Sequence, residues 1–192
     1  MTGVQTCALP ISLLSHAWLR QQTAAPLILW GLRTGATLAV DLSRDLPDIQ
    51  RLILWQPVNN GDMFLNQFLR IKLASEMLAE GQAQSGTKAL RAQLEKGEGI
   101  EVGGNMLSSA MAIQLCAIKL ADMQPTCPVR WLEIGAEAGT KPTPASQRIV
   151  DIWRAAGINV DIETVVGESF WVMQEITECQ SLLEATTRGF NV

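Results

Sequence analysis

The chain has 192 residues, of which 47% are hydrophobic and 18% charged, and it carries a formal net charge of −4. This length is enough for one sizeable core, or for a core with an inserted subdomain, and no apolar run approaches the roughly 20 residues that cross a bilayer. The mild negative charge, without a clustered stripe of Lys and Arg, argues against nucleic acid as a partner.

The first eleven residues, MTGVQTCALPI, resemble the in-frame translation of a sequencing adapter. We therefore expect residues 1–11 to be an artefact and the natural chain to begin before Ser12. They do not read as a signal peptide, because CALPI is too short for its apolar segment and no basic region precedes it. Cys116, Cys127 and Cys179 then remain, widely spaced and odd in number, which is typical of reduced cytosolic thiols that fill small core positions.

Residues 26–42 predict a strand, a sharp turn and a helix. Residues 27–30 form the short apolar run of a buried strand, Gly31 and Gly35 flank the turn, and apolar residues then recur with helical spacing. Glycine-x-nucleophile-x-glycine is the nucleophile elbow of α/β hydrolases, in which the two glycines let the strand and the helix approach closely. In this chain the central residue is Arg33, which stays protonated and cannot be the attacking group.

The remaining pattern indicates a core interrupted by an insertion. Residues 12–60 contain the end of an amphipathic helix, the elbow and a second buried strand, which form a right-handed βαβ unit. Residues 61–124 contain three helices, which we interpret as a cap inserted over the strand ends. Residues 125–192 resume the alternation with a buried strand, a helix, a half-exposed edge strand and a last helix over 173–187.

The first helix of the cap is predicted over residues 62–80, with Asp62 as its capping residue. Phe64, Phe68, Ile71 and Leu78 share one face of this helix by their spacing. We expect that face to pack within the cap.

The order of elements is that of the C-terminal two-thirds of an α/β hydrolase, so the predicted fold is a partial α/β-hydrolase fold: a parallel sheet flanked by helices, with a helical cap and without the N-terminal strands. In that fold the acid follows the strand after the cap, and the histidine follows the last strand. The acid loop offers Glu133 and Glu137, and Ser169 stands at the histidine position. The only histidine, His16, precedes the elbow and is expected to be an ordinary satisfied histidine. Because serine cannot replace a triad histidine in proton exchange near neutral pH, the positions of Arg33 and Ser169 lack the chemistry of a triad.

Several residues near the strand ends are candidates for ligand binding. Trp30 and Trp55 end adjacent strands, where α/β folds bind ligands, although large aromatics there also serve as lids on the core. Arg33 could clamp a carboxylate or a phosphate beside a helix N-terminus. It could equally hold a structural ion pair with Glu168 or with either glutamate of the acid loop.

Three segments of the sequence resemble one particular group of α/β-hydrolase-like proteins. WGLRTGATLAVDL, LILWQPVNNGDMFLNQFLRIKLASEML and VVGESFWVMQEITE resemble the exosortase A system-associated hydrolase 2 group, α/β-hydrolase-like proteins found beside PEP-CTERM sorting and exopolysaccharide genes in bacteria. The likeness covers residues 13–187, and an arginine at the elbow belongs to the pattern of that group. The resemblance implies a cytoplasmic protein encoded near a surface-sorting system, and it establishes no substrate.

These observations support three hypotheses. The first is a ligand-binding or accessory protein that takes an acyl- or anion-bearing metabolite near Arg33, with no cofactor and no metal. The second is an active ester or acyl hydrolase that uses Ser169 or Glu168 together with groups from a missing N-terminal segment. The third is a scaffold whose cap binds a protein partner.

Overall fold

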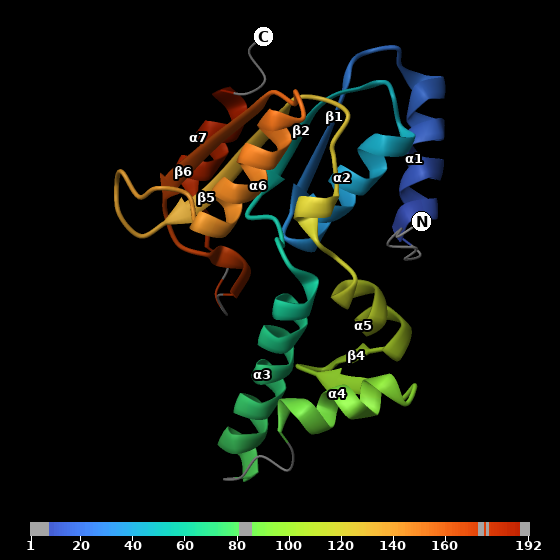
Figure 1. Ribbon diagram of the computed structural model, residues 1–192, viewed down its shortest axis with the longest axis vertical. Coiled ribbons are helices and arrows are strands. Elements are labelled where there is room, and N and C mark those ends of the chain that lie inside the picture. Colours follow the sequence, from blue (N-terminus) through green and yellow to red (C-terminus); the bar gives the residue numbers. More distant parts are fainter. Residues whose placement is uncertain (1–7, 81–85, 173–174, 176, 189–192) are drawn as a thin grey trace. The chain divides into compact units, whose positions relative to one another are not determined.

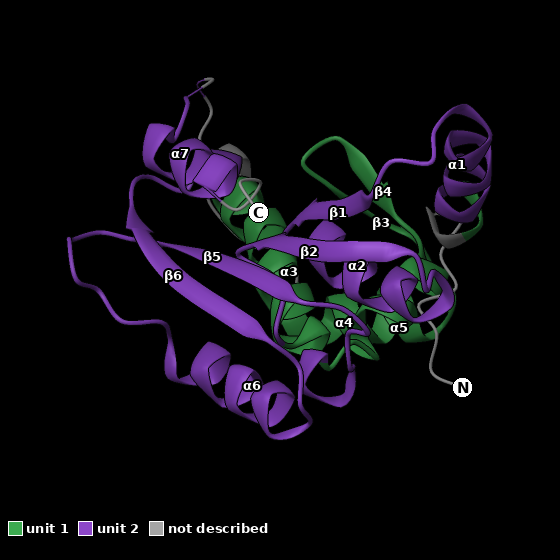
Figure 2. Ribbon diagram, turned by 90° about the horizontal axis from the view of Figure 1, so that it is seen from above, with its two compact units in different colours: residues 1–11, 60–119 green, residues 12–59, 120–192 purple. Residues whose placement is uncertain are grey.

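The computed structural model describes residues 8–80, 86–172, 175 and 177–188. The chain divides into two compact units (Figures 1 and 2). Unit 1 consists mainly of Asn60–Lys119, and unit 2 consists of Ser12–Asn59 and Leu120–Val192.

Unit 2 is built around a four-stranded sheet with the order β1-β2-β5-β6. Its strands are β1 (Leu27–Leu32), β2 (Ile49–Trp55), β5 (Val129–Gly135) and β6 (Val160–Val166). All three strand pairs are parallel, so the four carboxyl ends lie at one edge of the sheet and the four amino ends at the other. β6 lies at a side of the sheet, as its alternating pattern predicts.

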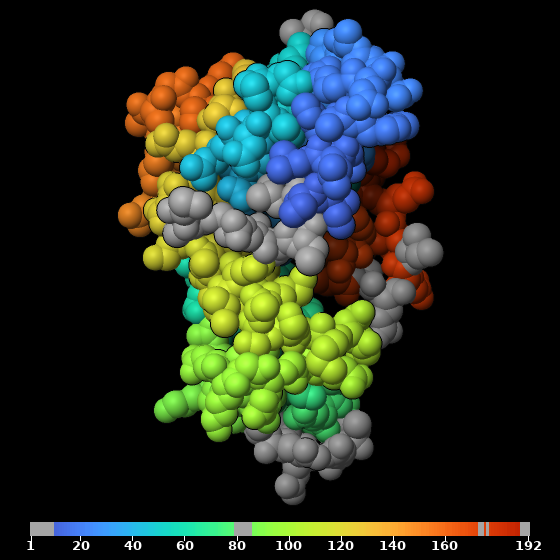
Figure 3. All heavy atoms as spheres, turned by 90° about the vertical axis from the view of Figure 1, so that its right-hand side faces the viewer, coloured from blue at the N-terminus to red at the C-terminus, as the bar shows by residue number. Residues whose placement is uncertain are grey.

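Helices cover both faces of this sheet. Figure 2 shows α2 (Thr34–Asp45) and α6 (Pro144–Ala155) on one side of the sheet and α7 (Gln180–Arg188) on the other. α1 (Ala8–Gln22) lies beside α2, as the space-filling view shows in blue and cyan (Figure 3). Two short 3-10 helices, Leu120–Asp122 and Phe170–Val172, complete the unit.

The two faces of the sheet have separate apolar cores. Beneath α6, Trp131 of β5 and Trp153 of α6 are fully buried, with ring centroids 5.6 Å apart. Beneath α7, the side chains of the sheet and the helix form one buried cluster: Ile53, Trp55, Leu132, Val165, Cys179, Leu182 and Ala185. These contacts fix the positions of the strand ends.

The last helix is shorter than predicted. We expected it over residues 173–187, but α7 begins at Gln180, and Thr177–Cys179 are not helical. Residues 173, 174 and 176 of the predicted helix lie outside the described residues.

Unit 1 contains three helices and a hairpin: α3 (Gly61–Glu80), α4 (Thr87–Glu95), α5 (Ser109–Cys116), β3 (Ile100–Val102) and β4 (Asn105–Leu107). The pattern GIEV, residues 99–102, predicts the first strand of this antiparallel hairpin but not the second. The turn is formed by Gly103 and Gly104, whose φ angles are +55° and +79°. Positive φ at both central positions is the geometry of a tight hairpin, so the glycine pair was the signal for the second strand.

The predicted cap of α3 is wrong by two residues. The Met63 N–H donates a hydrogen bond of 3.0 Å to the Asn60 side-chain oxygen, so Asn60 is the capping residue. Asp62 lies in the first turn, and its carboxylate binds Arg91 of α4 instead.

The predicted apolar face of α3 is also partly wrong. Leu65 and Leu69 are the buried residues of this helix, with Phe68 packed against their cluster. Ile71 and Leu78 are 56% and 90% exposed. α3 carries apolar residues on more than one face, so spacing alone could not identify the face that packs.

Candidate functional site

The turn between β1 and α2 has the strained geometry of a nucleophile elbow. Arg33 has φ 55° and ψ −118°, a conformation that non-glycine residues seldom adopt and that costs on the order of 1–3 kcal/mol. A Cβ at Gly31 would lie 2.3 Å from the Gly35 carbonyl oxygen, so only glycine fits there. At Gly35, by contrast, no atom of the described residues lies within 4 Å of a Cβ. The close approach of strand and helix therefore requires Gly31 alone. The prediction that both glycines are needed is wrong.

Arg33 is held at the carboxyl edge of the sheet by main-chain and aromatic contacts. Its backbone N–H donates to the Trp55 carbonyl at 2.9 Å, and its Nη1 donates to the Gln56 carbonyl at 3.2 Å. The guanidinium carbon lies 5.8 Å from the ring centroid of Trp171, which is within the range of a cation–π contact. Burial lowers the pKa of Arg33 from its usual range because the charged form is partly desolvated.

Gln56 is a site residue that the sequence analysis missed. Its φ is +43°, its N–H donates to the Leu132 carbonyl at 2.8 Å, and its side-chain oxygen accepts from the Ile134 N–H at 2.9 Å. Gln56 thus joins the ends of β2 and β5 and presents its own carbonyl to Arg33. The one available signal was that it precedes Pro57, a context that restricts the backbone but does not predict a positive φ.

Four aromatic side chains form a continuous chain of ring contacts, which we call the aromatic wall: Trp30, Trp55, Phe170 and Trp171. The ring centroids are 4.6 Å apart for Trp30 and Trp55, 6.2 Å for Trp55 and Phe170, and 5.2 Å for Phe170 and Trp171. Each pair meets edge to face, an arrangement that aromatic quadrupoles favour. The wall runs from β1 to the loop after β6 and ends at the guanidinium of Arg33.

Trp55 is the last residue of β2, but Trp30 lies two residues before the end of β1 and pairs with Ile53, so the prediction that Trp30 ends its strand is wrong. The two tryptophans also differ in exposure. Trp55 is 6% exposed, and its indole Nε1–H donates to the Thr186 Oγ1 of α7 at 2.9 Å. Trp30 is 53% exposed. Trp55 therefore covers the core, while Trp30 presents an open apolar surface beside it.

The positions equivalent to the other triad residues lie in loops after β5 and β6. Glu137 is exposed, and its carbonyl accepts from the Thr140 hydroxyl at 2.6 Å. Glu168 is exposed and Ser169 is half-buried, and their carbonyls accept from the backbone N–H groups of Phe170 and Val172. These main-chain bonds form the short helix that carries Trp171 to Arg33.

Glu133 is a buried anchor for α6. One of its carboxylate oxygens accepts from the Trp131 Nε1–H at 3.2 Å and from the Ser146 hydroxyl, and the other accepts from the Thr143 N–H at 3.1 Å. Thr143 caps α6 through Ser146. Glu133 therefore ties β5 to the start of that helix.

His16 lies at the opposite edge of the sheet from Arg33. Its Nε2 is 2.9 Å from Asp48 Oδ1, and Arg20 binds the same carboxylate just before β2 begins. Burial alone would raise the pKa of Asp48, but hydrogen bonds from Arg20 and His16 outweigh it and hold that pKa below its usual range. His16 is thus the satisfied histidine that the sequence analysis expects.

We also searched the described residues for metal sites, membrane-spanning helices and reactive thiols. No group of three or more His, Cys, Asp or Glu residues there is placed to hold a metal ion. None of the helices in those ranges has the length and apolarity needed to traverse a bilayer. Cys116, Cys127 and Cys179 are thiols, and burial raises the pKa of Cys127 to about 11.

No protein-family model matches the sequence, and no curated protein matches it. Solved structures match in fold. A "Putative hydrolase from Agrobacterium vitis S4" has a TM-score of 0.51 and 17% identity over 85% of this chain and 59% of its own. Est1E from Butyrivibrio proteoclasticus, solved with ferulic acid bound, has a TM-score of 0.53 and 11% identity over 93% and 65% of the two chains. The α/β hydrolase GrgF from Penicillium sp. sh18 has a TM-score of 0.50 and 14% identity over 90% and 68%.

The chain has an α/β-hydrolase fold. It spans 59% to 68% of the lengths of these three structures. At such low identity the likeness concerns the fold alone, and the function must be argued from the residues at the site.

Proposed function

We propose that this chain is a ligand-binding or accessory protein on an α/β-hydrolase fold, and that it takes a small molecule with an anionic group and an acyl chain at Arg33. The observation that carries the proposal is the elbow itself. Its strained φ of 55° is kept, but the side chain that it presents is a guanidinium instead of a nucleophile.

The surroundings of Arg33 suit such a ligand. A guanidinium offers parallel N–H donors that match a carboxylate or a phosphate. Partial burial, which lowers the pKa of Arg33, also strengthens its attraction for an anion because less water screens the charge. The start of α2 adds the positive end of a helix dipole directly after Arg33.

The acyl part of the ligand would lie on the aromatic wall. The wall ends at Arg33 through Trp171, and Trp30 at its other end is 53% exposed. Because Phe170 and Trp171 are only half-buried, an anion bound at the guanidinium would have apolar surface beside it. This arrangement distinguishes an amphiphilic ligand from a simple inorganic anion.

The alternative is an active ester or acyl hydrolase using Ser169 or Glu168. Arginine cannot attack an ester, and the only histidine of the sequence is bound to Asp48 at the opposite edge of the sheet. A hydrolase would therefore need groups outside this chain to activate Ser169.

Calorimetric titration with hexanoate, and with hexanamide as its neutral counterpart, tests the proposal. Hexanoate is expected to bind about tenfold or more tightly than hexanamide, since a hydrogen bond to a charged group contributes about 1.5–3 kcal/mol. Arg33→Met should remove this preference and Arg33→Lys should keep part of it, because lysine retains the charge without the fork. Arg44→Met is the matched control, because Arg44 is an exposed arginine in the last turn of α2, the helix that begins directly after Arg33. Equal affinity for the two probes contradicts the proposal.

The biological setting is a second part of the proposal. The resemblance of residues 13–187 to the exosortase A system-associated hydrolase 2 group supports a cytoplasmic role beside PEP-CTERM sorting and exopolysaccharide genes. Sequencing the source DNA across the codon of Ser12 and through the flanking genes tests it. We expect an exosortase gene to lie nearby. A neighbourhood without sorting or exopolysaccharide genes would contradict this assignment.

A further inference from the structure

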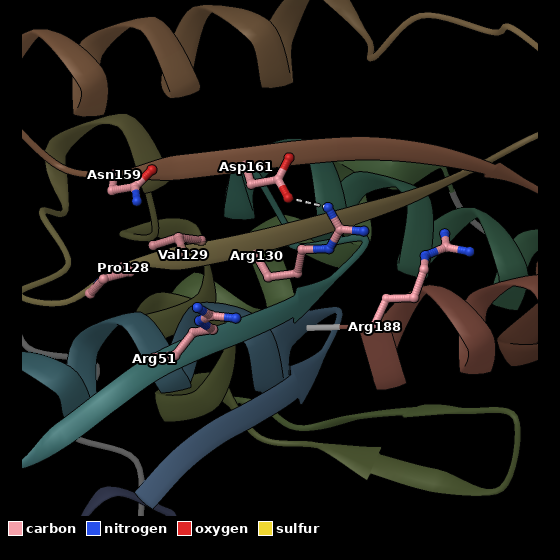
Figure 4. Close-up of a pocket in the computed structure, with 7 residues that line it drawn as sticks. All are labelled: Arg51, Pro128, Val129, Arg130, Asn159, Asp161 and Arg188. Carbon is pink, nitrogen blue, oxygen red and sulfur yellow. Dashed lines mark hydrogen bonds and ion pairs between the residues drawn. The ribbon is translucent and has the colours of Figure 1, made fainter. Parts of the chain in front are cut away.

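Two cavities of unit 2 differ in their lining. At the amino edge of the sheet, Figure 4 shows Arg130 beside Asp161, and the Arg130 guanidinium is paired with the carboxylates of both Asp161 and Glu163. Arg188 of the same cavity is paired with Glu163, with 2.8 Å between Nη2 and Oε1. These ion pairs are compensated within the chain and stabilise the sheet. The other cavity lies on the flank of β1, and its lining is mainly apolar.

The apolar cavity lies between α1, β1 and α2 and has a volume of about 400 Å³. β1 is at a side of the sheet, so its flank is bordered by these two helices instead of by a further strand. Leucine and alanine side chains of all three elements line the cavity: Leu19, Leu27, Leu29, Leu38, Ala39, Leu42 and Leu46. Four of these leucines, at positions 19, 27, 29 and 38, are only half-buried. A ligand in the cavity would therefore remove apolar surface from water.

Gly35 leaves one end of the cavity open. The close approach of strand and helix does not need this glycine, because no atom of the described residues lies within 4 Å of a Cβ there. Gly35 does line the cavity, in the first turn of α2, and a longer side chain would occupy space that the glycine leaves empty. Leu46 lines the same cavity just after the end of α2, about 16 Å from Gly35 along the helix at a rise of about 1.5 Å per residue. The cavity is therefore elongated.

The polar lining of the cavity lies on α1 and includes Ser12 and His16. The His16 ring is held because its Nε2 lies 2.9 Å from Asp48 Oδ1, which leaves Nδ1 as the ring nitrogen available to a ligand. Asp48 is also paired with Arg20, so the charges at this end are compensated and a neutral head group suits it. A hydroxyl both donates and accepts hydrogen bonds, so it fits either protonation state of the ring.

We propose that this cavity binds a neutral amphiphile with one unbranched alkyl chain, of about six to ten carbons, and a hydroxyl head group. The chain would lie along β1 between the leucines of α1 and α2, and the hydroxyl would bond to His16. Burial of the chain drives binding, by about fourfold in affinity for each methylene removed from water. The volume of about 400 Å³ falls within the range of small-molecule pockets, about 300–1,000 Å³.

Calorimetric titration of the whole chain with 1-butanol, 1-hexanol and 1-octanol tests the proposal. The affinity is expected to rise about tenfold or more at each step, because each step buries two further methylenes. The diol 1,8-octanediol should bind at least about tenfold more weakly than 1-octanol, since its second hydroxyl would be buried among leucines. His16→Phe should weaken 1-octanol binding about fivefold and leave the dependence on chain length in place.

Gly35→Leu fills the open end of the cavity and should weaken 1-octanol binding about tenfold or more. Gly86→Leu is the matched control, because Gly86 also has no atom of the described residues within 4 Å of a Cβ and lies before α4 in unit 1. Arg33→Met should leave 1-octanol binding unchanged, which separates this cavity from the elbow. Thermal unfolding of each variant establishes that it is folded.

Four results would overturn the proposal. An affinity that does not rise with chain length would show that the alkyl chain is not buried. Equal losses in Gly35→Leu and Gly86→Leu would place the alcohol elsewhere, and a loss in Arg33→Met would place it at the elbow. A dimer in light scattering that Gly35→Leu separates into monomers would show that a second copy of the chain fills the cavity.

Discussion

The two edges of the parallel sheet use arginine in different ways. At the amino edge, Arg130 is held by Asp161 and Glu163, and Arg20 by Asp48. At the carboxyl edge, Arg33 donates to a backbone carbonyl and lies against an indole ring. Ion pairs with carboxylates fix the arginine side chains of the amino edge. A strained backbone and aromatic packing position Arg33 at the carboxyl edge.

We infer that the arginines of the amino edge stabilise the fold, whereas Arg33 presents a group that can bind a ligand. Both positive-φ non-glycine residues of the described chain, Arg33 and Gln56, lie at the carboxyl edge. Strained conformations persist where the surrounding structure over-determines them, and they cluster at functional sites. The carboxyl edge is also where open α/β sheets bind ligands, so the strain, the aromatic wall and the partly desolvated charge coincide there.

The largest expected effect is at the elbow glycines. Gly31→Ala places a Cβ 2.3 Å from a backbone oxygen that cannot move freely, so it should lower the free energy of unfolding by about 3 kcal/mol or more. Gly35→Ala is the matched control, because its Cβ meets open space within a helix and alanine should leave stability unchanged or raise it by about 0.5–1 kcal/mol. Urea unfolding measures both. Equal destabilisation would show that the elbow does not depend on the first glycine alone.

A smaller effect is expected behind the aromatic wall. Thr186→Val removes the acceptor of the Trp55 indole N–H and leaves that donor buried, which should cost about 1–3 kcal/mol. Thr187→Val, at an exposed neighbouring position of α7, is the control. Chemical unfolding followed by circular dichroism compares them. A loss no larger than that of the control would show that Trp55 does not need this bond to hold the wall.

The smallest effect is at the amino edge and depends on pH. Burial opposes ionisation of Asp48, but hydrogen bonds from Arg20 and His16 outweigh this effect and lower the pKa of Asp48. Ionised Asp48 therefore stabilises the folded state at pH values above its ordinary pKa of 3.8. This contribution is lost as the pH falls below that value. The difference in urea midpoint between the unsubstituted chain and Asp48→Asn should therefore be present at pH 6 and shrink at pH 3.

The control for that titration is Asp45→Asn, at an exposed carboxylate at the end of α2. A difference for Asp48→Asn that stays constant from pH 6 to pH 3 would show that the cluster of Asp48, Arg20 and His16 does not couple ionisation to folding. The two edges would then differ less than the contacts indicate.

The elbow could be predicted from the sequence, because it is a local feature. An apolar run, two glycines and a helical pattern fix the strand, the turn and the position of Arg33 within a few residues. The aromatic wall could be predicted only in part: the sequence places Trp30 and Trp55 on adjacent strands, but Trp171 comes from the loop after β6 and joins them only through the strand order and the packing of α7.

Unit 1 was predicted less well for a related reason. The packing face of α3 depends on which of its many apolar residues the hairpin and α5 contact, and Leu69 was not distinguishable from Ile71 by spacing.

The most direct test of the central claim, that the elbow presents a binding group and no nucleophile, is intact-mass analysis after treatment with a serine-directed fluorophosphonate. We predict that the mass of the protein stays unchanged, because Arg33 cannot be phosphonylated and Ser169 has no histidine to activate it. A stoichiometric adduct that disappears in Ser169→Ala would contradict the account and establish a hydrolase that uses the loop after β6.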